Sequence, residues 1–467
     1  MSAERDPIRA DASAIAAAVK SGRTTARAVA LAHLERIAAL DPGLGAFTAV
    51  TRERALAEAD AVDAAVAAGR DPGPLAGVPY AVKNLFDLAG LVTVAGSKIN
   101  RADPPPARDA TLVERMKGAG AVLLGALNMG EYAYDFTGEN AHDGASRNPH
   151  DPGHMSGGSS GGSGTAAAAG LATITLGSDT NGSIRVPASF CGLFGLKPTY
   201  GRLARGGTFP FVASIDHLGP LARSVHDLAL SYDAMQGTDP RDPACTPAGI
   251  EPATPVIGQG TQGLRIAVAG GWFARGGMPE AHRAVATVAE ALGVSRTVDL
   301  PGAQEARAAA YLVTATEAAS FHLARLRSRP GDFDPAVRDR LLAGAMAPAA
   351  WVAQAHKVRR WWRDRMLAVF QDVDVLIAPA TPCRAPLLGQ ATMTLAGVEM
   401  AVRPNIGLFT QPISFAGLPV VAVPVWENDA ALPIGVQVIA APWREDIALR
   451  VAAALERDGV CTARVAG

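Results

Sequence analysis

The chain has 467 residues, of which 49% are hydrophobic and 19% are charged, so a large buried core is expected. Its formal net charge of −1 excludes a general electrostatic attraction to nucleic acid or to a membrane surface. The four cysteines are far apart and form no Cys-x-x-Cys pair, which argues against a disulfide framework and against a zinc site. The polar start MSAERDPIRA and the lack of a long apolar run predict a cytoplasmic protein without a membrane span.

The first part of the chain, residues 1–70, is expected to be helical and to cover the outside of the core. Apolar residues recur at helical spacing in three segments, 11–20, 25–40 and 52–68. Asp11 and Thr25 are suitable N-caps for the first two of them. Nothing in these helices suggests chemistry, so their predicted role is structural.

Residues 71–237 are expected to form the core that carries the chemistry. After a Pro/Gly turn at 71–77, the apolar run 78–86 predicts a strand with one lysine inside it, Lys83. A lysine in such a run most often lays its stem on a surface and keeps its ammonium in water. Burial would instead lower its pKa, and a neutral lysine amine is a competent general base.

The next segments predict a helix at 109–120 followed by a strand at 121–124. A repeated helix–strand order is typical of an α/β sheet with parallel neighbours. The polar and aromatic segment 128–140 is expected to be a loop or a short helix. Glu131, Tyr134 and His142 could face a site there, although structural roles are equally compatible with the sequence.

The stretch from Gly157 to Pro187 carries the strongest local pattern. Two glycine-rich runs flank an expected helix at 163–171 and a short buried strand at 173–176. A tight turn is expected at 178–183. A serine on such a turn, preceded by free N–H groups, can be a nucleophile beside an oxyanion hole. A flexible linker is the plainer alternative, but linkers do not continue into an apolar strand. A phosphate-binding loop fails because no Gly-Lys-Ser/Thr follows.

Downstream, residues 190–201 are expected to be a compact, turn-rich segment, and a helix is expected at 224–235. Between them, the neighbours Asp216 and His217 could be half of a Ser-His-Asp triad. Lys83 is the better candidate base, so this alternative is the weaker one.

A surface loop is expected at 238–263, and residues 264–467 are expected to complete the sheet and the substrate pocket. Strands are expected at 264–269, 373–378, 418–424 and 433–440, and helices at 279–292, 306–325, 349–372 and 445–458. The helical part carries several arginines, most of them expected in solvent. One or two of them could reach an anionic substrate; they are Arg325, Arg327, Arg329, Arg338 and Arg340.

Three stretches of this sequence resemble the amidase signature family. They are GVPYAVKN around Lys83, GGSSGGSG around Ser159 and GSDTNGSIRVPASFCGLFGLKPT around Ser183. The two serines lie 24 residues apart, as in the family pattern, and the resemblance covers nearly the whole chain. It implies a single large α/β domain, in which a mixed twisted β-sheet is sandwiched between α-helices.

The resemblance also implies a Ser–cis-Ser–Lys triad that hydrolyses amide C–N bonds without a metal or a cofactor. Ser183 is then the nucleophile, Ser159 the bridging serine after a cis peptide bond from Gly158, and Lys83 the base. The oxyanion hole consists of the backbone N–H groups of Thr180, Asn181, Gly182 and Ser183. Supporting positions are Asp179, Arg185 and Ser160.

One position departs from the family pattern. Many members have Gly-Gly before the nucleophile, whereas this chain has Asn181 and Gly182. The asparagine still supplies a backbone N–H. Its side chain is expected either to narrow the pocket or to contact a small polar substrate.

Within the family, the chain is most similar to enzymes of cyanuric acid breakdown that release ammonia from a small urea-like carboxylate. This implies a homodimer core with a small helical partner subunit in a heterotetramer, and neither a nucleic acid nor a membrane as partner. Arg205 and the arginines of the helical half offer physical support for a bound carboxylate. Three alternatives stay open: the amidase subunit of a glutamine-dependent tRNA amidotransferase, an amidase of another small nitrogen compound, and a catalytically silent scaffold.

Overall fold

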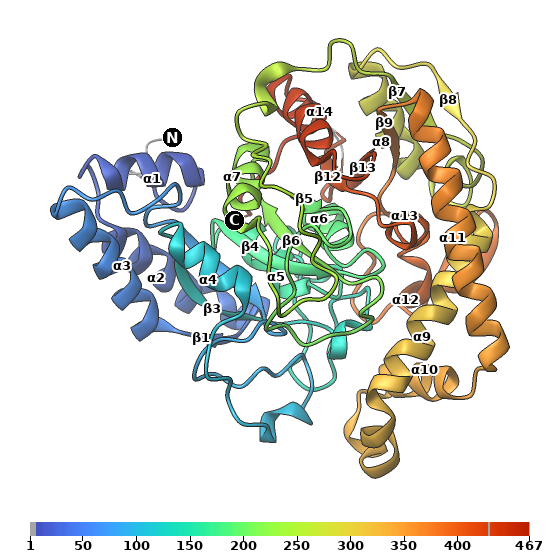
Figure 1. Cartoon of the computed structure of the whole chain (residues 1–467), viewed down its shortest axis with the longest axis horizontal. Helices are drawn as coiled ribbons and strands as arrows, with labels where there is room; N and C mark the ends of the chain where they lie inside the picture. Colours follow the sequence, from blue (N-terminus) through green and yellow to red (C-terminus); the bar gives the residue numbers. More distant parts are fainter. Residues whose placement is uncertain (1–5, 428–429, 467) are drawn as a thin grey trace.

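The computed structural model describes residues 6–427 and 430–466 of the chain. Within these residues an 11-stranded mixed sheet runs through the molecule in the order β1-β3-β2-β4-β6-β5-β12-β13-β9-β7-β8. The N-terminal helices α1, α2 and α3 lie at one end of the molecule, and α9, α10 and α11 lie at the other (Figure 1). This is the mixed sheet between helices that the resemblance implied.

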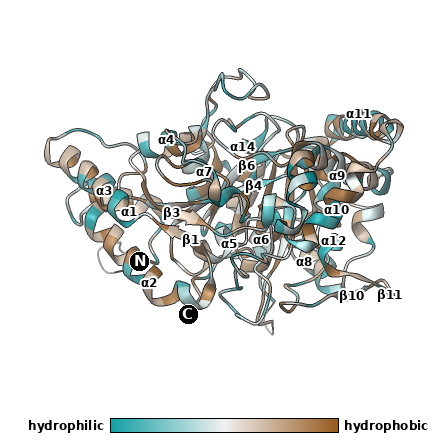
Figure 2. Cartoon of the chain, turned by 90° about the horizontal axis from the view of Figure 1, so that it is seen from below, coloured by the Kyte–Doolittle hydropathy of each residue, from teal (hydrophilic) through white to brown (hydrophobic). Residues whose placement is uncertain are grey.

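The strands of the large sheet are short and mostly buried. They are β1 (Phe47–Val50), β2 (Pro79–Lys83), β3 (Val122–Leu127), β4 (Ile174–Asp179), β5 (Phe194–Lys197), β6 (His217–Ala222), β7 (Ile266–Ala269), β8 (Thr297–Val298), β9 (Val375–Pro379), β12 (Val420–Val425) and β13 (Ile434–Ala440). A separate two-stranded hairpin of β10 (Thr392–Leu395) and β11 (Val398–Ala401) lies at the periphery (Figure 2).

The helices cover the sheet and close its two ends. They are α1 (Ala12–Lys20), α2 (Ala26–Leu44), α3 (Arg52–Ala67), α4 (Thr111–Gly118), α5 (Gly161–Ala168), α6 (Arg185–Cys191), α7 (Val225–Met235), α8 (Pro279–Ala291), α9 (Ala303–Ser328), α10 (Pro335–Ala345), α11 (Ala349–Asp372), α12 (Val402–Asn405), α13 (Gln411–Ala416) and α14 (Glu445–Arg457). In Figure 2, α3 carries both hydrophobic and hydrophilic turns, as expected of a helix with one face on the core. Among the described residues, no helix is both long and apolar enough to cross a membrane.

The parallel pair β2 and β4 positions the central chemistry. Tyr80 pairs with Ile174 and Val82 pairs with Leu176, so the carboxyl ends of both strands lie at the same edge of the sheet. Every residue of the two strands is buried, which is why they appear as continuous apolar runs rather than alternating ones. Lys83 ends β2, and Asp179 ends β4.

The glycines before α5 permit very close packing. A Cβ on Gly162 would lie 2.4 Å from the carbonyl oxygen of Ala46 and 2.6 Å from the backbone nitrogen of Asn128. No side chain fits at that distance. The small helix α5 can therefore lie directly against the neighbouring backbone, and this sets the position of the serines that precede it.

Two segments differ from the sequence prediction because burial hides their patterns. The part of 190–201 expected to be only turns contains the end of α6 and all of β5. Every residue of α6 is buried, so it has no polar face to reveal a helical period, and Pro187 stands inside it. The strand β6 was not predicted because Gly219 and Pro220 stand within it, and proline is rare in central strands.

Several element boundaries also differ. Helix α2 continues past the predicted end at residue 40, through Pro42, to a left-handed cap at Gly45. The turn expected at 178–183 is shorter, because Ser178 and Asp179 still belong to β4. The sequence prediction omitted β1, the β10–β11 hairpin and α10, all of which consist of short segments.

Candidate active site

Lys83 is fully buried where β2 ends, and three hydroxyl groups surround its amine. Nζ donates hydrogen bonds to Ser159 Oγ at 2.7 Å, to Ser178 Oγ at 2.8 Å and to Ser160 Oγ at 3.0 Å. Within residues 6–427 and 430–466, Lys83 forms no ion pair with a carboxylate. The amine therefore has good hydrogen-bond partners but no directly bound counter-charge.

Burial lowers the pKa of Lys83 from its ordinary value of 10.5 to about 7. The negative charges of Asp179, Asp216 and Asp135 act in the opposite direction and only partly offset the loss of hydration. The amine thus exchanges between charged and neutral forms near neutral pH. In the neutral form its lone pair can accept a proton from one of the adjacent hydroxyls.

Ser159 and Ser160 lie immediately before α5 and are both fully buried. The peptide bond between Gly158 and Ser159 is cis, as the resemblance implied. The hydroxyl of Ser160 donates to the carbonyl oxygen of Ser178 at 3.2 Å, so Ser160 can act toward Lys83 as an acceptor only. Ser159 has no such second partner among the described residues, which leaves its proton available to the amine.

Ser183 lies in the turn between β4 and α6 and lines a small cavity. The cavity volume is about 20 Å³, which is room for about one water molecule. Among the described residues, no hydrogen bond joins Ser183 to Ser159. Hydrogen bonds of this kind are often long in ligand-free sites and shorten when substrate binds. The structure therefore brings Lys83 and Ser159 together but records no bond from that pair to Ser183.

The turn that precedes Ser183 presents unused backbone donors. Within the described part of the chain, none of the N–H groups of residues 180–183 donates a hydrogen bond. Gly182 has a φ of 142°, and a Cβ there would lie 2.3 Å from Thr410 Oγ1. Only glycine fits this position. Thr410 in turn donates to the carbonyl oxygen of Asn181 at 2.7 Å, which holds the turn in place.

Asp179 and Arg185 hold the ends of the same turn. They form a fully buried two-point ion pair, with Nε and Nη2 of Arg185 each 2.9 Å from a carboxylate oxygen. Burial disfavours the carboxylate, but the charge and hydrogen bonds of Arg185 outweigh it and hold the pKa of Asp179 well below its ordinary value. Asp179 also accepts the N–H of Ile184 at 3.2 Å. These contacts fix the loop, as the resemblance implied.

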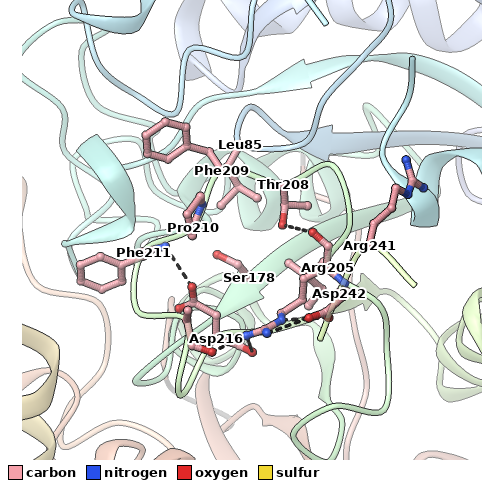
Figure 3. Close-up of a pocket in the computed structure, with 12 residues that line it drawn as sticks. Leu85, Ser178, Arg205, Thr208, Phe209, Pro210, Phe211, Asp216, Arg241 and Asp242 are labelled. Carbon is pink, nitrogen blue, oxygen red and sulfur yellow. Dashed lines mark hydrogen bonds and ion pairs between the residues drawn. The ribbon is translucent and has the colours of Figure 1, made fainter. Parts of the chain in front are cut away.

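Ser178 is a contact of Lys83 that the sequence did not single out. Figure 3 shows it facing a second cavity, of about 130 Å³, beside Asp216 and Phe211. Asp216 accepts the hydroxyl of Thr180 at 2.6 Å and the N–H of Phe211 at 2.9 Å. No motif marks Ser178, because its role depends on the pairing of β2 with β4.

Arg205 also borders this second cavity, and its charge is already paired. Its guanidinium binds Asp242, with Nη2 2.8 Å and Nε 3.0 Å from the carboxylate oxygens (Figure 3). It therefore supports a substrate clamp less well than the sequence suggested. Among the five arginines singled out in the helical half, only Arg340 lines the cavity with Ser183.

Arg340 is a half-buried cation without a carboxylate partner. Its Nε donates to the carbonyl oxygen of Ala336 at 2.9 Å, and its Nη2 donates to the carbonyl oxygen of Tyr134. Among the described residues, no carboxylate oxygen lies within 4.0 Å of it and its Nη1 makes no hydrogen bond. Of the polar residues suggested near a site, Tyr134 also lines this cavity, whereas Glu131 binds His142 at 3.0 Å and is not part of the lining.

The alternative triad through His217 has no support in the geometry. His217 Nδ1 lies 3.0 Å from the backbone oxygen of Asp179, and no hydrogen bond joins its side chain to Asp216 or to a serine within the described residues. Burial lowers the pKa of His217 well below its ordinary value. The residue is therefore a neutral, buried part of β6.

The sequence match agrees with this geometry over most of the chain. A model of the amidase family matches residues 28–449. The chain belongs to the amidase family. It is therefore a hydrolase that acts on amide bonds, on the same α/β fold as the other amidases.

Two curated relatives and one solved structure place the chain within the family. AtzE, which is part of the 1-carboxybiuret hydrolase of Pseudomonas sp. (strain ADP), is 56% identical over 95% of this chain and 97% of that protein. The amidase component of the glutamyl-tRNA(Gln) amidotransferase of Synechococcus sp. (strain RCC307) is 37% identical over 93% of this chain and 94% of that protein. A structure described as a vestigial protein complex, which reveals the evolutionary origins of an s-triazine catabolic enzyme, has a TM-score of 0.96 and 55% identity, and covers 97% of this chain and 100% of its own.

Proposed function

We propose that this amidase removes ammonia from 1-carboxybiuret to give 1,3-dicarboxyurea, through a Ser183–Ser159–Lys83 triad. Two observations support the proposal. The chain is 56% identical to a 1-carboxybiuret hydrolase subunit over nearly its full length. The observation that carries the catalytic part is the fully buried Lys83 amine, 2.7 Å from Ser159 in the same site as Ser183.

The first step of the proposed mechanism is a proton relay. Neutral Lys83 accepts the proton of Ser159, and Ser159 accepts the proton of Ser183 as Ser183 attacks the scissile carbonyl carbon. A serine hydroxyl needs such an adjacent base, because it is a weak nucleophile at neutral pH. The closed cavity implies that substrate binding brings Ser183 and Ser159 into hydrogen-bond contact.

The second step uses the unpaired N–H groups of the turn. They stabilise the negative oxygen of the tetrahedral intermediate, and each such donor is worth about 3 kcal/mol in comparable hydrolases. Collapse of the intermediate breaks the C–N bond, and the relayed proton leaves with ammonia. Water then attacks the acyl-enzyme with the same relay as base, which releases the acid product and restores Ser183.

Arg340 is the residue we assign to the substrate carboxylate. It lines the Ser183 cavity and no carboxylate neutralises it, while Asp135 in the same lining is already paired with Arg403. A guanidinium can hold a carboxylate through two hydrogen bonds, and its free Nη1 supplies one donor. A small substrate has few other atoms to bind, so this contact would position it for attack.

We further propose a homodimer core with a small helical partner subunit. The support is that the 56% identical relative is named as one subunit of its enzyme, and that the structure with a TM-score of 0.96 is described as a protein complex. In this chain Met346 and Trp351, on either side of the connection between α10 and α11, are 83% and 58% exposed. Exposed apolar groups of this size are typical of a protein interface.

An ammonia-release assay tests the function and separates it from the main alternative. The substrates are 1-carboxybiuret, biuret, which lacks the carboxylate, and glutamine, each assayed with and without the small subunit encoded beside the gene. We expect 1-carboxybiuret to have by far the highest kcat/KM. If glutamine is the best substrate, the chain is instead the amidase subunit of an amidotransferase.

Two arginine variants provide the control for the carboxylate contact. Arg340→Met is expected to raise KM for 1-carboxybiuret at least tenfold while leaving the slower biuret reaction nearly unchanged. Arg338→Met, on the same helix, removes an arginine that pairs with Asp339 at the surface and is expected to change neither. If Arg340→Met affects both substrates equally, the clamp is wrong.

A further inference from the structure

Asn181 is the point at which this chain departs from the Gly-Gly of many family members, and its side chain has an unused bonding group. The residue is 6% exposed and lines the same cavity as Ser183. Among the described residues that line this cavity, its Oδ1 is the one buried side-chain polar atom without a hydrogen-bond partner. A buried amide oxygen without a partner is costly, so a ligand that donates to it would be favoured.

The other half of the amide fixes the direction of this oxygen. Nδ2 donates to Thr314 Oγ1 at 2.9 Å, and Thr314 belongs to the long helix α9. With the amide nitrogen held against α9, Oδ1 faces away from that helix. Asn181 is therefore a fixed acceptor, two residues from the nucleophile and beside the unused N–H groups of its own turn.

The remaining polar groups of the lining are already used. The hydroxyl of Thr180 donates to Asp216, and that of Tyr311 donates to the carbonyl oxygen of Pro404. Gln411 Oε1 accepts Nε of Arg307 at 2.9 Å. The cavity therefore offers a ligand backbone donors, the guanidinium of Arg340 and one well-placed acceptor, Asn181 Oδ1.

We propose that Asn181 Oδ1 accepts a hydrogen bond from an N–H group on the acyl side of the scissile carbonyl, and so selects ureido substrates over carbon amides. A ureido carbonyl has nitrogen on both sides, whereas the carbonyl of glutamine or malonamate has a methylene on the acyl side. A methylene next to Oδ1 would leave the acceptor buried without a partner. This inference rests on the proposed function and specifies the substrate class of the same site.

The test compares two acids that differ only in this group. Allophanate has an N–H where malonamate has a CH2, and each is measured as a substrate by ammonia release and as a competitive inhibitor of 1-carboxybiuret hydrolysis. Wild-type enzyme is expected to favour allophanate over malonamate at least tenfold in kcat/KM or in inhibition constant. In Asn181→Ala the preference is expected to fall to within about threefold of unity.

A second variant separates recognition from loop structure. Thr314→Val removes the anchor of the amide but keeps Asn181, and is expected to reduce the preference less than Asn181→Ala does. Thermal unfolding of each variant checks that it folds. If Asn181→Ala lowers both acids equally, or if it retains the wild-type preference, the proposed contact is wrong.

The outcomes also distinguish this inference from the proposed function. Failure of wild-type enzyme to release ammonia from 1-carboxybiuret, with its partner present, would overturn the function itself. Turnover of 1-carboxybiuret together with an unchanged preference in Asn181→Ala would overturn only the role of Asn181.

Discussion

At the scale of single residues, the site depends on a lysine that is buried without a counter-ion. Three hydroxyls satisfy its hydrogen bonds, but none of them carries a charge. An ion pair would have favoured the charged form and raised the pKa, whereas hydroxyls leave the effect of burial largely uncompensated. A lysine in this setting can be neutral at the pH at which the enzyme works.

The activity is therefore predicted to rise with pH through the titration of Lys83. The neutral amine is the active form and its pKa is about 7, so log kcat/KM should rise with a slope of one below pH 7 and level off above it. At pH 6 the rate should be about tenfold below the plateau. Lys83→Arg cannot lose its proton in this range and should be inactive.

A second buried lysine supplies the control for this profile. Burial also lowers the pKa of Lys197 to about 7, but its Nζ donates to the carbonyl oxygens of Pro198 and Leu418 rather than to the serines. Lys197→Met is expected to lose stability without moving the pH midpoint of the remaining activity. A midpoint that moves in Lys197→Met, or an active Lys83→Arg, would remove Lys83 as the base.

At the scale of elements, two parallel strands and one small helix bring the reacting groups together. β2 delivers Lys83, β4 delivers Ser178 and the start of the turn, and α5 begins directly after Ser159 and Ser160. The spacing between these groups depends on how closely α5 approaches the backbone beside β3. Gly162 determines that approach, because a side chain there would meet Ala46 and Asn128.

Gly162→Ala is therefore expected to lower the free energy of unfolding by about 1–3 kcal/mol, the usual effect of overpacking a core. The matched control is Gly118→Ala, at the end of α4, where the new Cβ would have no atom within 4 Å. It should be neutral, or stabilising by about 0.5–1 kcal/mol. The measurement is the midpoint of thermal unfolding of each variant. Equal midpoints would show that close packing at Gly162 is unimportant.

The elements also show which parts of the fold a sequence can predict. The cap residues Thr25 and Ser224 were identifiable, and each accepts the N–H three residues on, at 3.0 and 3.1 Å. Their signals are local and depend on a few adjacent residues. α6 and β6 lacked such signals, because a fully buried helix shows no polar face and Pro220 is atypical of a central strand.

At the scale of the whole molecule, the candidate site draws on residues from position 83 to position 411. Its motif half, Lys83 with the serines, could be predicted because each residue stands inside a recognisable stretch. Arg340 and Thr314 could not be chosen from the sequence. They belong to helices at the far end of the molecule, and only the tertiary fold brings α9 and α10 over the turn that carries Ser183 (Figure 1).

The most direct measurement of the central claim is the position of a covalent adduct. Wild-type enzyme, Ser183→Ala and Ser159→Ala are treated with a serine-reactive sulfonyl fluoride, and peptides are mapped by mass spectrometry beside the ammonia-release rate. We predict an adduct on Ser183 in wild type, none in Ser183→Ala together with less than a few per cent of turnover, and a much slower reaction on Ser183 in Ser159→Ala. An adduct on Ser159, or substantial turnover in Ser183→Ala, would contradict the account.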